Sequence, residues 1–295
     1  MIVDCHTQLA DWGVELGAAR PAISSPAAGS DAVRHLEAID SVDRAIVLGF
    51  KSKYLAAEVS NRSVSDYVRR HSAKLIGFAG IDPTDPDCLQ ELRTAQDELG
   101  LKGVTLSPAL QNFHPTDTRA MRLYDECARR RLPIVFEQNH MNPAAKMEFG
   151  RATLLDEVAR EFPALRIVVA HMGYPWVDET IVLLGKHPHV YADVSGLLRK
   201  PWLAYTSLLA AFEHGVMNRL LFGSDFPRRS PAACIEALYS INQIRNGTGL
   251  VAIPREQLRG IVERETLSLL GIDGGATASR PMAPAPPAMD DDEPA

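Results

Sequence analysis

Residues 219–227 read RLLFGSDFP, and this stretch decides the fold that we expect for the whole chain. An apolar run, LLF, is broken by Gly-Ser, and Asp225 follows at once. Pro227 cannot donate a backbone hydrogen bond, so a strand has to end before it. The pattern predicts a buried strand that presents Asp225 at its carboxyl-terminal tip, where barrels of parallel strands hold their chemistry. A turn-forming aspartate after an ordinary strand explains the stretch equally well, so the rest of the chain has to decide.

Seven further apolar segments predict strands, and segments with helical periodicity separate them. The eight predicted strands are 2–6, 44–49, 75–81, 102–106, 133–137, 166–171, 189–193 and 219–222. The predicted helices are 32–40, 59–71, 88–100, 119–130, 153–162, 178–185, 203–214, 231–245 and 254–270. Several strands are apolar nearly throughout, as strands buried on both faces are. The alternation predicts an α/β fold, a (β/α)8 TIM barrel, over residues 1–272.

The last part of the chain has a different composition. Residues 273–295 are rich in Ala and Pro and end in an acidic run, DDDE at 290–293. Such a segment cannot bury enough apolar surface to fold, so we expect a disordered tail. Its role is open at this stage.

Composition excludes several classes of partner. The 295 residues are 46% hydrophobic and 23% charged, with a formal net charge of -6 and no basic stripe. We therefore expect no nucleic-acid or membrane partner, and no run approaches the length of a membrane span. The chain begins directly with a strand, without the basic and apolar regions of a secretory signal. Four scattered cysteines show no CxxC spacing, so we expect reduced thiols and a cytoplasmic location.

Polar side chains stand at the ends of five of the predicted strands. They are His6, Gln8, Glu137, His171, Asp193 and Asp225. In a barrel all of them converge on one mouth. Two histidines and several carboxylates suit a divalent metal, beside which a carboxylate or imidazole takes a proton from water.

The chain resembles the amidohydrolase superfamily, specifically the amidohydrolase-related (amidohydrolase 2) branch. That branch includes aminocarboxymuconate-semialdehyde decarboxylase and related decarboxylases, hydratases and lactonases. The resemblance covers about residues 1–272 and rests on five segments in family order. They are VDCHTQ (3–8), GVTLSP (103–108), LPIVFE (132–137), VAHMG (169–173) and FGSDFP (222–227).

The resemblance implies a metal site with two departures from the family pattern. Its implied ligands are His6, Gln8, Glu137 and Asp225, but Gln8 and Glu137 stand where the family usually has histidine. Asp225 is implied to be both a ligand and a proton acceptor, and His171 to contact the reactive water or substrate. The oxygen-rich set shifts the expected metal from zinc toward manganese or magnesium. A metal-free mechanism, with His171 and Asp225 as an acid–base pair, stays open.

Other polar residues near the predicted mouth are candidate substrate-binding residues: Gln111, His114, His140 and Arg228. Arg228 can bind a substrate carboxylate through its guanidinium fork, although a solvated arginine is the commoner case. Glu137 could pair with an arginine inside the barrel instead of a metal. Asp193 either orients a neighbouring side chain or caps the turn at 195–196. The remaining histidines His35, His71 and His187 are expected on the surface.

The resemblance implies a hydrolase acting on a small carboxylated or cyclic substrate by water attack at a C–O or C–N bond. In this hypothesis Asp225 is the base and His171 stabilises developing charge. One alternative is a non-oxidative decarboxylase of the same family. Another is a catalytically inactive barrel that serves as a ligand sensor or scaffold. The expected partner is a small-molecule substrate, and the resemblance also allows a homodimer.

Overall fold

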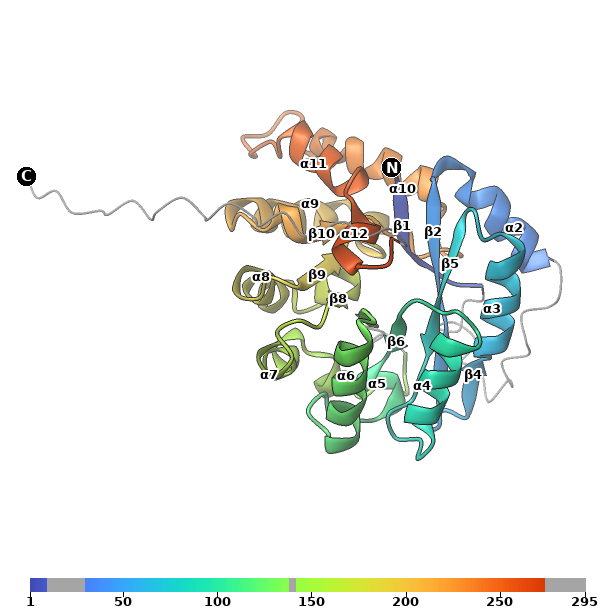
Figure 1. Cartoon of the computed structure of the whole chain (residues 1–295). Helices are drawn as coiled ribbons and strands as arrows, with labels where there is room; N and C mark the ends of the chain where they lie inside the picture. The colour runs from blue at the N-terminus through green and yellow to red at the C-terminus, as the bar shows by residue number, and fades with distance from the viewer. Residues whose placement is uncertain (10–29, 138–141, 274–295) are drawn as a thin grey trace, which may run out of the picture.

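Eight parallel strands form one ring in the computed structural model, which describes residues 1–9, 30–137 and 142–273 (Figure 1). In sheet order they are β1 (Val3–Thr7), β2 (Arg44–Leu48), β5 (Leu75–Gly80), β6 (Val104–Leu106), β7 (Ile134–Phe136), β8 (Ile167–Val169), β9 (Val190–Asp193) and β10 (Leu220–Leu221). Backbone bonds close the ring between its two ends, since the Cys5 N–H donates to the Phe222 carbonyl at 2.9 Å. Each strand overlaps one predicted from the sequence, so the predicted (β/α)8 barrel is confirmed. The predicted tail lies outside the described residues.

The described helices surround the ring and agree broadly with the sequence prediction. They are α2 (Ser30–Ala38), α3 (Asn61–Arg70), α4 (Cys88–Asp97), α5 (Pro108–Gln111), α6 (Thr118–Arg130), α7 (Leu155–Glu161), α8 (Val177–Lys186), α9 (Pro201–Glu213), α10 (Pro231–Tyr239), α11 (Arg255–Val262) and α12 (Thr266–Leu270). Asp117 begins α6 by accepting a hydrogen bond from the Arg119 N–H, as an N-cap does. None of the described helices is both long and apolar enough to cross a bilayer.

The structure differs from the sequence prediction in one helix near the carboxyl end and in one additional hairpin after β2. The single helix expected over 254–270 is broken at residues 263–265 into α11 and α12. The break has a packing reason, because the short α12 buries Leu267 and Leu270 among the side chains that fill the barrel. A hairpin of β3 (Phe50–Ser52) and β4 (Ala57–Val59) was not predicted and follows β2 directly.

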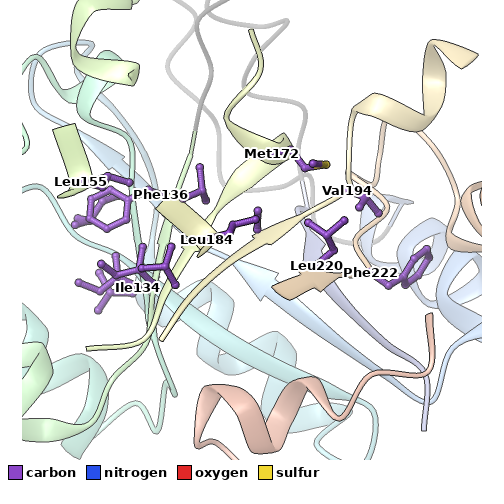
Figure 2. Packing of buried hydrophobic residues seen from close by; sticks show 14 of the residues in the cluster. Ile134, Phe136, Leu155, Met172, Leu184, Val194, Leu220 and Phe222 are labelled. Atoms are coloured by element: carbon purple, nitrogen blue, oxygen red, sulfur yellow. The ribbon is translucent and has the colours of Figure 1, made fainter. Parts of the chain in front are cut away.

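The hydrophobic residues form two layers, one inside the ring and one between the ring and its helices. Alternate residues of each strand face the two layers, so Val135 lies in the inner cluster while Ile134 and Phe136 lie in the outer one. Figure 2 shows the outer layer, with Phe136 of β7 close to Leu155 of α7. The inner cluster fills the ring below the polar strand ends, so the barrel is a packed core and its carboxyl end carries the site.

Two histidines expected on the surface are buried. His35 of α2 is 0% exposed, and its Nδ1 lies 2.8 Å from the hydroxyl of Tyr67. Its ring also packs 5.1 Å from that of Phe226, which follows the predicted catalytic aspartate. His187 is 9% exposed and its Nε2 bonds to Asp156 Oδ1 at 2.7 Å. The surface prediction was wrong for both residues because partners far away in the sequence cover them.

A methyl group added at Gly103, just before β6, should destabilise the barrel. An added Cβ would lie 2.4 Å from the ring of Phe78, which is fully buried inside the ring of strands. We expect Gly103→Ala to lower the free energy of unfolding by about 1–3 kcal/mol, as overpacked cores do. Urea denaturation measures the change, and Gly249→Ala is the matched control because a Cβ there meets nothing within 4 Å. Equal midpoints for the two variants would contradict this packing.

Burial of His35 should make stability depend on pH. Burial lowers the pKa of His35 from 6.5 to about 4. The unfolded chain therefore takes up a proton between these values and the folded chain does not, so stability is complete above pH 6.5 and is lost as the pH falls toward 4. The shift corresponds to a loss of about 2 kcal/mol between pH 7 and pH 5.

The variant His35→Gln isolates this contribution, because glutamine does not titrate and can still bond to Tyr67. Urea midpoints of the two proteins at pH 7 and pH 5 give the measurement. We expect the free energy of unfolding to decrease between pH 7 and pH 5 by about 2 kcal/mol less in the variant than in the wild type. Parallel decreases in the two proteins would show that His35 titrates normally.

Candidate active site

The imidazole of His6 lies between two carboxylates at the carboxyl end of the barrel. Its Nδ1–H donates to Asp193 Oδ2 at 2.9 Å, and its Nε2 lies 2.8 Å from Glu137 Oε1. Asp225 Oδ1 lies 4.0 Å from the same Nε2. His6, Asp193 and Glu137 are all 0% exposed. The structure therefore brings together residues that the sequence placed at the ends of β1, β7, β9 and β10.

Two residues of the β1–β10 junction fix the backbone of His6. Asp4 Oδ1 accepts hydrogen bonds from the His6 N–H at 3.1 Å and from the Ser224 N–H at 3.0 Å. Gly223 lets the strands approach, since a Cβ there would lie 2.8 Å from the Cβ of His6. The Asp225 N–H in turn donates to the His6 carbonyl at 3.0 Å. His6 and Asp225 are thus held in register by the closure of the barrel.

Glu137 and Gln8, which the resemblance implied to stand in place of histidines, contact each other. The amide of Gln8 donates to Glu137 Oε1 at 3.1 Å, and Gln8 is 5% exposed. Glu137 Oε2 lies 3.7 Å from His171 Nε2. Glu137 therefore faces both histidines of the site.

His171 stands on a strained turn just after β8. Its backbone φ is 56° and that of Met172 is 49°, in the left-handed region that residues with a side chain seldom adopt. The His171 N–H donates to Asp193 Oδ1 at 3.0 Å, and its Nδ1–H bonds to Ser195 Oγ at 2.8 Å. These bonds leave Nε2 facing Glu137. The sequence left two roles open for Asp193, and the structure shows contacts for both. Asp193 orients His6 and His171, and it caps the turn by accepting a hydrogen bond from the Ser195 N–H at 3.0 Å.

Asp225 follows β10 and lies beside His6 at the same mouth. Its backbone is also left-handed, with φ of 61°, and its side chain is buried. Oδ2 makes no hydrogen bond within the described structure, but Arg199 Nη2 and Arg228 Nη1 each lie 3.6 Å from it. The carboxylate consequently has imidazole on one side and two guanidinium groups on the other.

Charge and burial compete in this cluster. Burial alone would lower the pKa of His6, but the Glu137 and Asp193 carboxylates raise that pKa well above its usual range. Burial alone would raise the pKa of Glu137, and His6 together with His171 instead holds it well below the usual value. For His171 the effect of burial is likewise outweighed, by Glu137 and Asp225, so its pKa is raised. Glu137 is therefore ionised near neutral pH.

The side chains present fit a divalent cation. One ligand atom each from His6, His171 and Asp225 lies within 4.8 Å of the others. His6 Nε2 makes no hydrogen bond, despite its short contact with Glu137 Oε1, so the two atoms are not aimed at each other. Its other nitrogen is held by Asp193, as carboxylates orient metal-binding histidines. Two imidazoles with carboxylates are ligands for zinc or manganese.

The predicted substrate-binding residues have different surroundings. Gln111 gives its amide to backbone groups: Nε2 donates to the carbonyls of Lys51 and Ile81 at 2.6 Å each, and Oε1 accepts from the Ser107 N–H. His114 is exposed and bonds to Thr116. For both residues the contact with substrate stays a prediction. Arg228 lies at the mouth beside Asp225, whereas His140 lies outside the described residues.

Sequence reasoning missed three residues that shape the site, namely Asp4, Ser195 and Arg199. Asp4 could have been found, because a carboxylate in the middle of a buried strand needs a local partner. Ser195 and Arg199 follow β9 in a loop, and only the folded loop brings the Arg199 guanidinium near Asp225. The one available signal was that both residues follow the carboxyl end of a barrel strand.

Several solved structures share this fold at low sequence identity. An uncharacterised TIM-barrel protein from Bordetella bronchiseptica has a TM-score of 0.70 and 18% identity, covering 92% of this chain and 98% of its own. A probable 2-pyrone-4,6-dicarboxylic acid hydrolase from Acinetobacter baumannii has a TM-score of 0.64 and 16% sequence identity, and the match covers 92% of this chain and 99% of the hydrolase. A dihydroxybenzoic acid decarboxylase from a Polaromonas species was solved with bound manganese and the inhibitor 2-nitroresorcinol. It has a TM-score of 0.63 and 15% sequence identity, and the match covers 93% of this chain and 98% of the decarboxylase.

A search of the curated proteins found no significant match. At the identities above, the structural likenesses show the fold alone. The sequence profile of the family described as Amidohydrolase, by contrast, matches residues 3–263. That span contains every strand of the barrel and His6, Glu137, His171 and Asp225 at its mouth, and the chain therefore belongs to the amidohydrolase family.

Proposed function

We propose that the chain is a hydrolase that uses activated water to open a C–O or C–N bond in a small, cyclic, carboxylated substrate. The observation that carries the proposal is the convergence of His6, His171 and Asp225 within 4.8 Å at the barrel mouth. Family membership supports an enzyme of hydrolytic or decarboxylating type. The bound substrate would face these side chains from the open end of the barrel.

His6 and Asp225, two of the three residues whose ligand atoms converge, would hold a divalent metal together with Glu137. Glu137 Oε1 lies 2.8 Å from His6 Nε2 and accepts a 3.1 Å hydrogen bond from Gln8. His171, the third converging residue, would then be left to face the substrate. A divalent ion there supplies Lewis acidity, which makes water a better nucleophile at neutral pH. Manganese and zinc both suit the donor set, and magnesium is the harder alternative. The manganese in the Polaromonas structure supports this range of metals by analogy only.

The proton and charge movements fall to Asp225 and His171. Asp225 lies 3.6 Å from two guanidinium groups and would accept the proton of the attacking water. His171 has a raised pKa and points Nε2 into the site, so its imidazolium form stabilises negative charge that develops on the substrate oxygen. Ser195 holds the His171 ring in this orientation through Nδ1.

Arg199 and Arg228 support a carboxylated substrate. Their guanidinium groups stand at the rim beside Asp225, with side chains 44% and 20% exposed, so they can also reach a ligand. Guanidinium forks pair with carboxylates through two parallel hydrogen bonds. The substrates named for the neighbours, 2-pyrone-4,6-dicarboxylic acid and dihydroxybenzoic acid, are likewise ring carboxylates.

Non-oxidative decarboxylation is the second candidate. The same two arginines favour it, because they could hold a ring carboxylate over the reactive centre while His171 or Asp225 handles a proton. Several structural neighbours are named decarboxylases, which keeps this reaction open.

The four cysteines are buried and form no disulfide among the described residues, which supports the predicted reducing, cytoplasmic location. A homodimer stays a prediction.

If Glu137 is a ligand, metal content should depend on its charge. We expect the purified protein, reconstituted with manganese or zinc, to hold about one ion per chain, and Glu137→Gln to weaken binding by about 100-fold or more, since even outer partners contribute 10- to 100-fold. Inductively coupled plasma mass spectrometry after dialysis measures this. Glu126→Gln is the control, since Glu126 is a buried carboxylate paired with Arg130 on α6. Wild type without metal under these conditions would remove the metal from the mechanism.

The reaction itself is tested with two probe classes. We expect metal-loaded protein to open a 2-pyrone-4,6-dicarboxylate ring, followed by ultraviolet absorbance, with kcat lowered about 10²- to 10⁴-fold in His171→Asn. His171→Asn should keep its fold, checked by circular dichroism, and Arg259→Gln on the outer face of α11 should be fully active. Release of carbon dioxide from 2,6-dihydroxybenzoate without ring opening would favour the decarboxylase. No turnover of either class by folded, metal-loaded protein would favour the inactive barrel.

A further inference from the structure

A basic residue directly precedes each of three neighbouring strands at the amino-terminal end of the barrel, opposite the candidate active site. Arg166 directly precedes β8, His189 precedes β9 and Arg219 precedes β10. These strands are consecutive in the sheet, and the Ile167 N–H donates to the His189 carbonyl at 3.0 Å. Because parallel strands start at one edge, the three basic side chains share one face of the molecule.

A fourth basic residue, Arg264, reaches the same face from the segment between α11 and α12. Its Nε–H donates to the Leu220 carbonyl at 2.8 Å and its Nη2–H to the Met217 carbonyl at 3.1 Å. The Arg219 guanidinium lies 5.9 Å from the centre of the ring of Tyr191, which is 3% exposed inside the barrel. These contacts gather positive charge around the underside of β9 and β10.

Arg166 completes the cluster next to α12. A Cβ built on Gly271, just after α12, would lie 2.8 Å from the guanidinium carbon of Arg166. In Figure 1 α12 lies across the middle of the ring of strands, which agrees with its role in closing this end. The cluster therefore sits around the helix that seals the barrel.

Among the described residues, the guanidinium groups of this cluster have no carboxylate within ion-pair distance. Within residues 1–9, 30–137 and 142–273, no ion pair joins Arg166, Arg219 or Arg264 to an acidic group within 4.0 Å, whereas Arg259 on the adjacent α11 pairs with Glu263 at 2.8 Å. Burial, with Arg219 nearby, lowers the pKa of Arg264, and burial with Arg166 and Arg219 lowers that of His189. The positive charges of Arg166, Arg219 and Arg264 thus repel one another where the side chains are only partly exposed to solvent.

We propose that this face, around Arg166, Arg219 and Arg264, is an oxyanion-binding site for a carboxylate, sulfate or phosphate group. Guanidinium groups bind such anions through charge-assisted hydrogen bonds, which are strongest when the groups are partly shielded from water. A bound anion would offset the mutual repulsion of the cations and stabilise the docking of α12. The site is separate from the proposed catalytic mouth and does not depend on the proposed reaction.

Two sources can supply the oxyanion. One is a free small anion. The other is the acidic run at residues 290–293 of the same chain, which begins 290 − 273 = 17 residues beyond the last described residue. Seventeen residues span at most roughly 60 Å when extended, so the run can reach this face from the end of α12. Both sources share the same chemistry, and the experiment separates them.

The test is calorimetric titration of the full-length protein with sodium sulfate at constant ionic strength. We expect saturable binding with a stoichiometry of about one, and affinity reduced about tenfold or more in Arg166→Gln and in Arg166→Gln/Arg219→Gln, since one charge-assisted bond accounts for a factor of this size. Arg166→Gln alone keeps the test valid if the double variant does not fold, because Arg166 makes no side-chain hydrogen bond in the described structure. Arg259→Gln, whose guanidinium is paired with Glu263, should bind as wild type does.

A second full-length variant neutralises the acidic run by Asp290→Asn, Asp291→Asn, Asp292→Asn and Glu293→Gln. If the run occupies the site, this variant binds sulfate about threefold or more tightly than wild type, because an effectively millimolar competitor is removed. Equal affinities identify a free anion as the occupant. The proposal is overturned if neither protein binds sulfate saturably, or if Arg259→Gln loses as much affinity as Arg166→Gln.

Discussion

The contact of the His6 imidazole with Asp193 and Glu137 is the constraint on which the rest of the structure depends. All three side chains are 0% exposed, and burying charge costs several kcal/mol per ion unless partners compensate it. The two carboxylates come from β9 and β7, on different parts of the ring, so the pairing is satisfied only when the barrel has closed. Asp4 and Gly223 then hold β1 against β10 at the required distance. Closing the fold and assembling the site are thus one event.

Much of the fold could be predicted because several of the buried parallel strands are apolar nearly throughout, and each of the eight predicted strands overlaps a strand of the barrel. The site residues could be placed at one mouth for the same reason, since carboxyl ends of parallel strands converge. The contact of Arg199 with Asp225 could not be predicted, because it depends on the shape of a loop. The burial of His35 was missed because it depends on Tyr67 and Phe226, and the turn into α12 because it depends on the space inside the barrel.

The chain has a formal net charge of -6, but its charged side chains are distributed unequally between the two ends of the barrel. The carboxyl end gathers Glu137, Asp193 and Asp225 around two histidines. The amino end gathers Arg166, Arg219 and Arg264 around Tyr191. The carboxylates around the two histidines suit a cation, while Arg199 and Arg228 at the rim of the same mouth suit an anionic group of the substrate. The amino end has guanidinium groups without such carboxylates among the described residues, so it suits anions alone.

The pairing of Gln8 with Glu137 bears on whether the mouth has been rebuilt or has lost its function. Replacing a neutral histidine by glutamate adds a buried anion, which needs a donor nearby. Gln8, at the other altered position, supplies that donor at 3.1 Å, and His6 faces the same carboxylate. Folding alone favours such a donor, although a small apolar residue would fill the space at lower cost. The Gln8–Glu137 pair keeps the mouth polar, as the proposed binding of a metal and a carboxylated substrate requires.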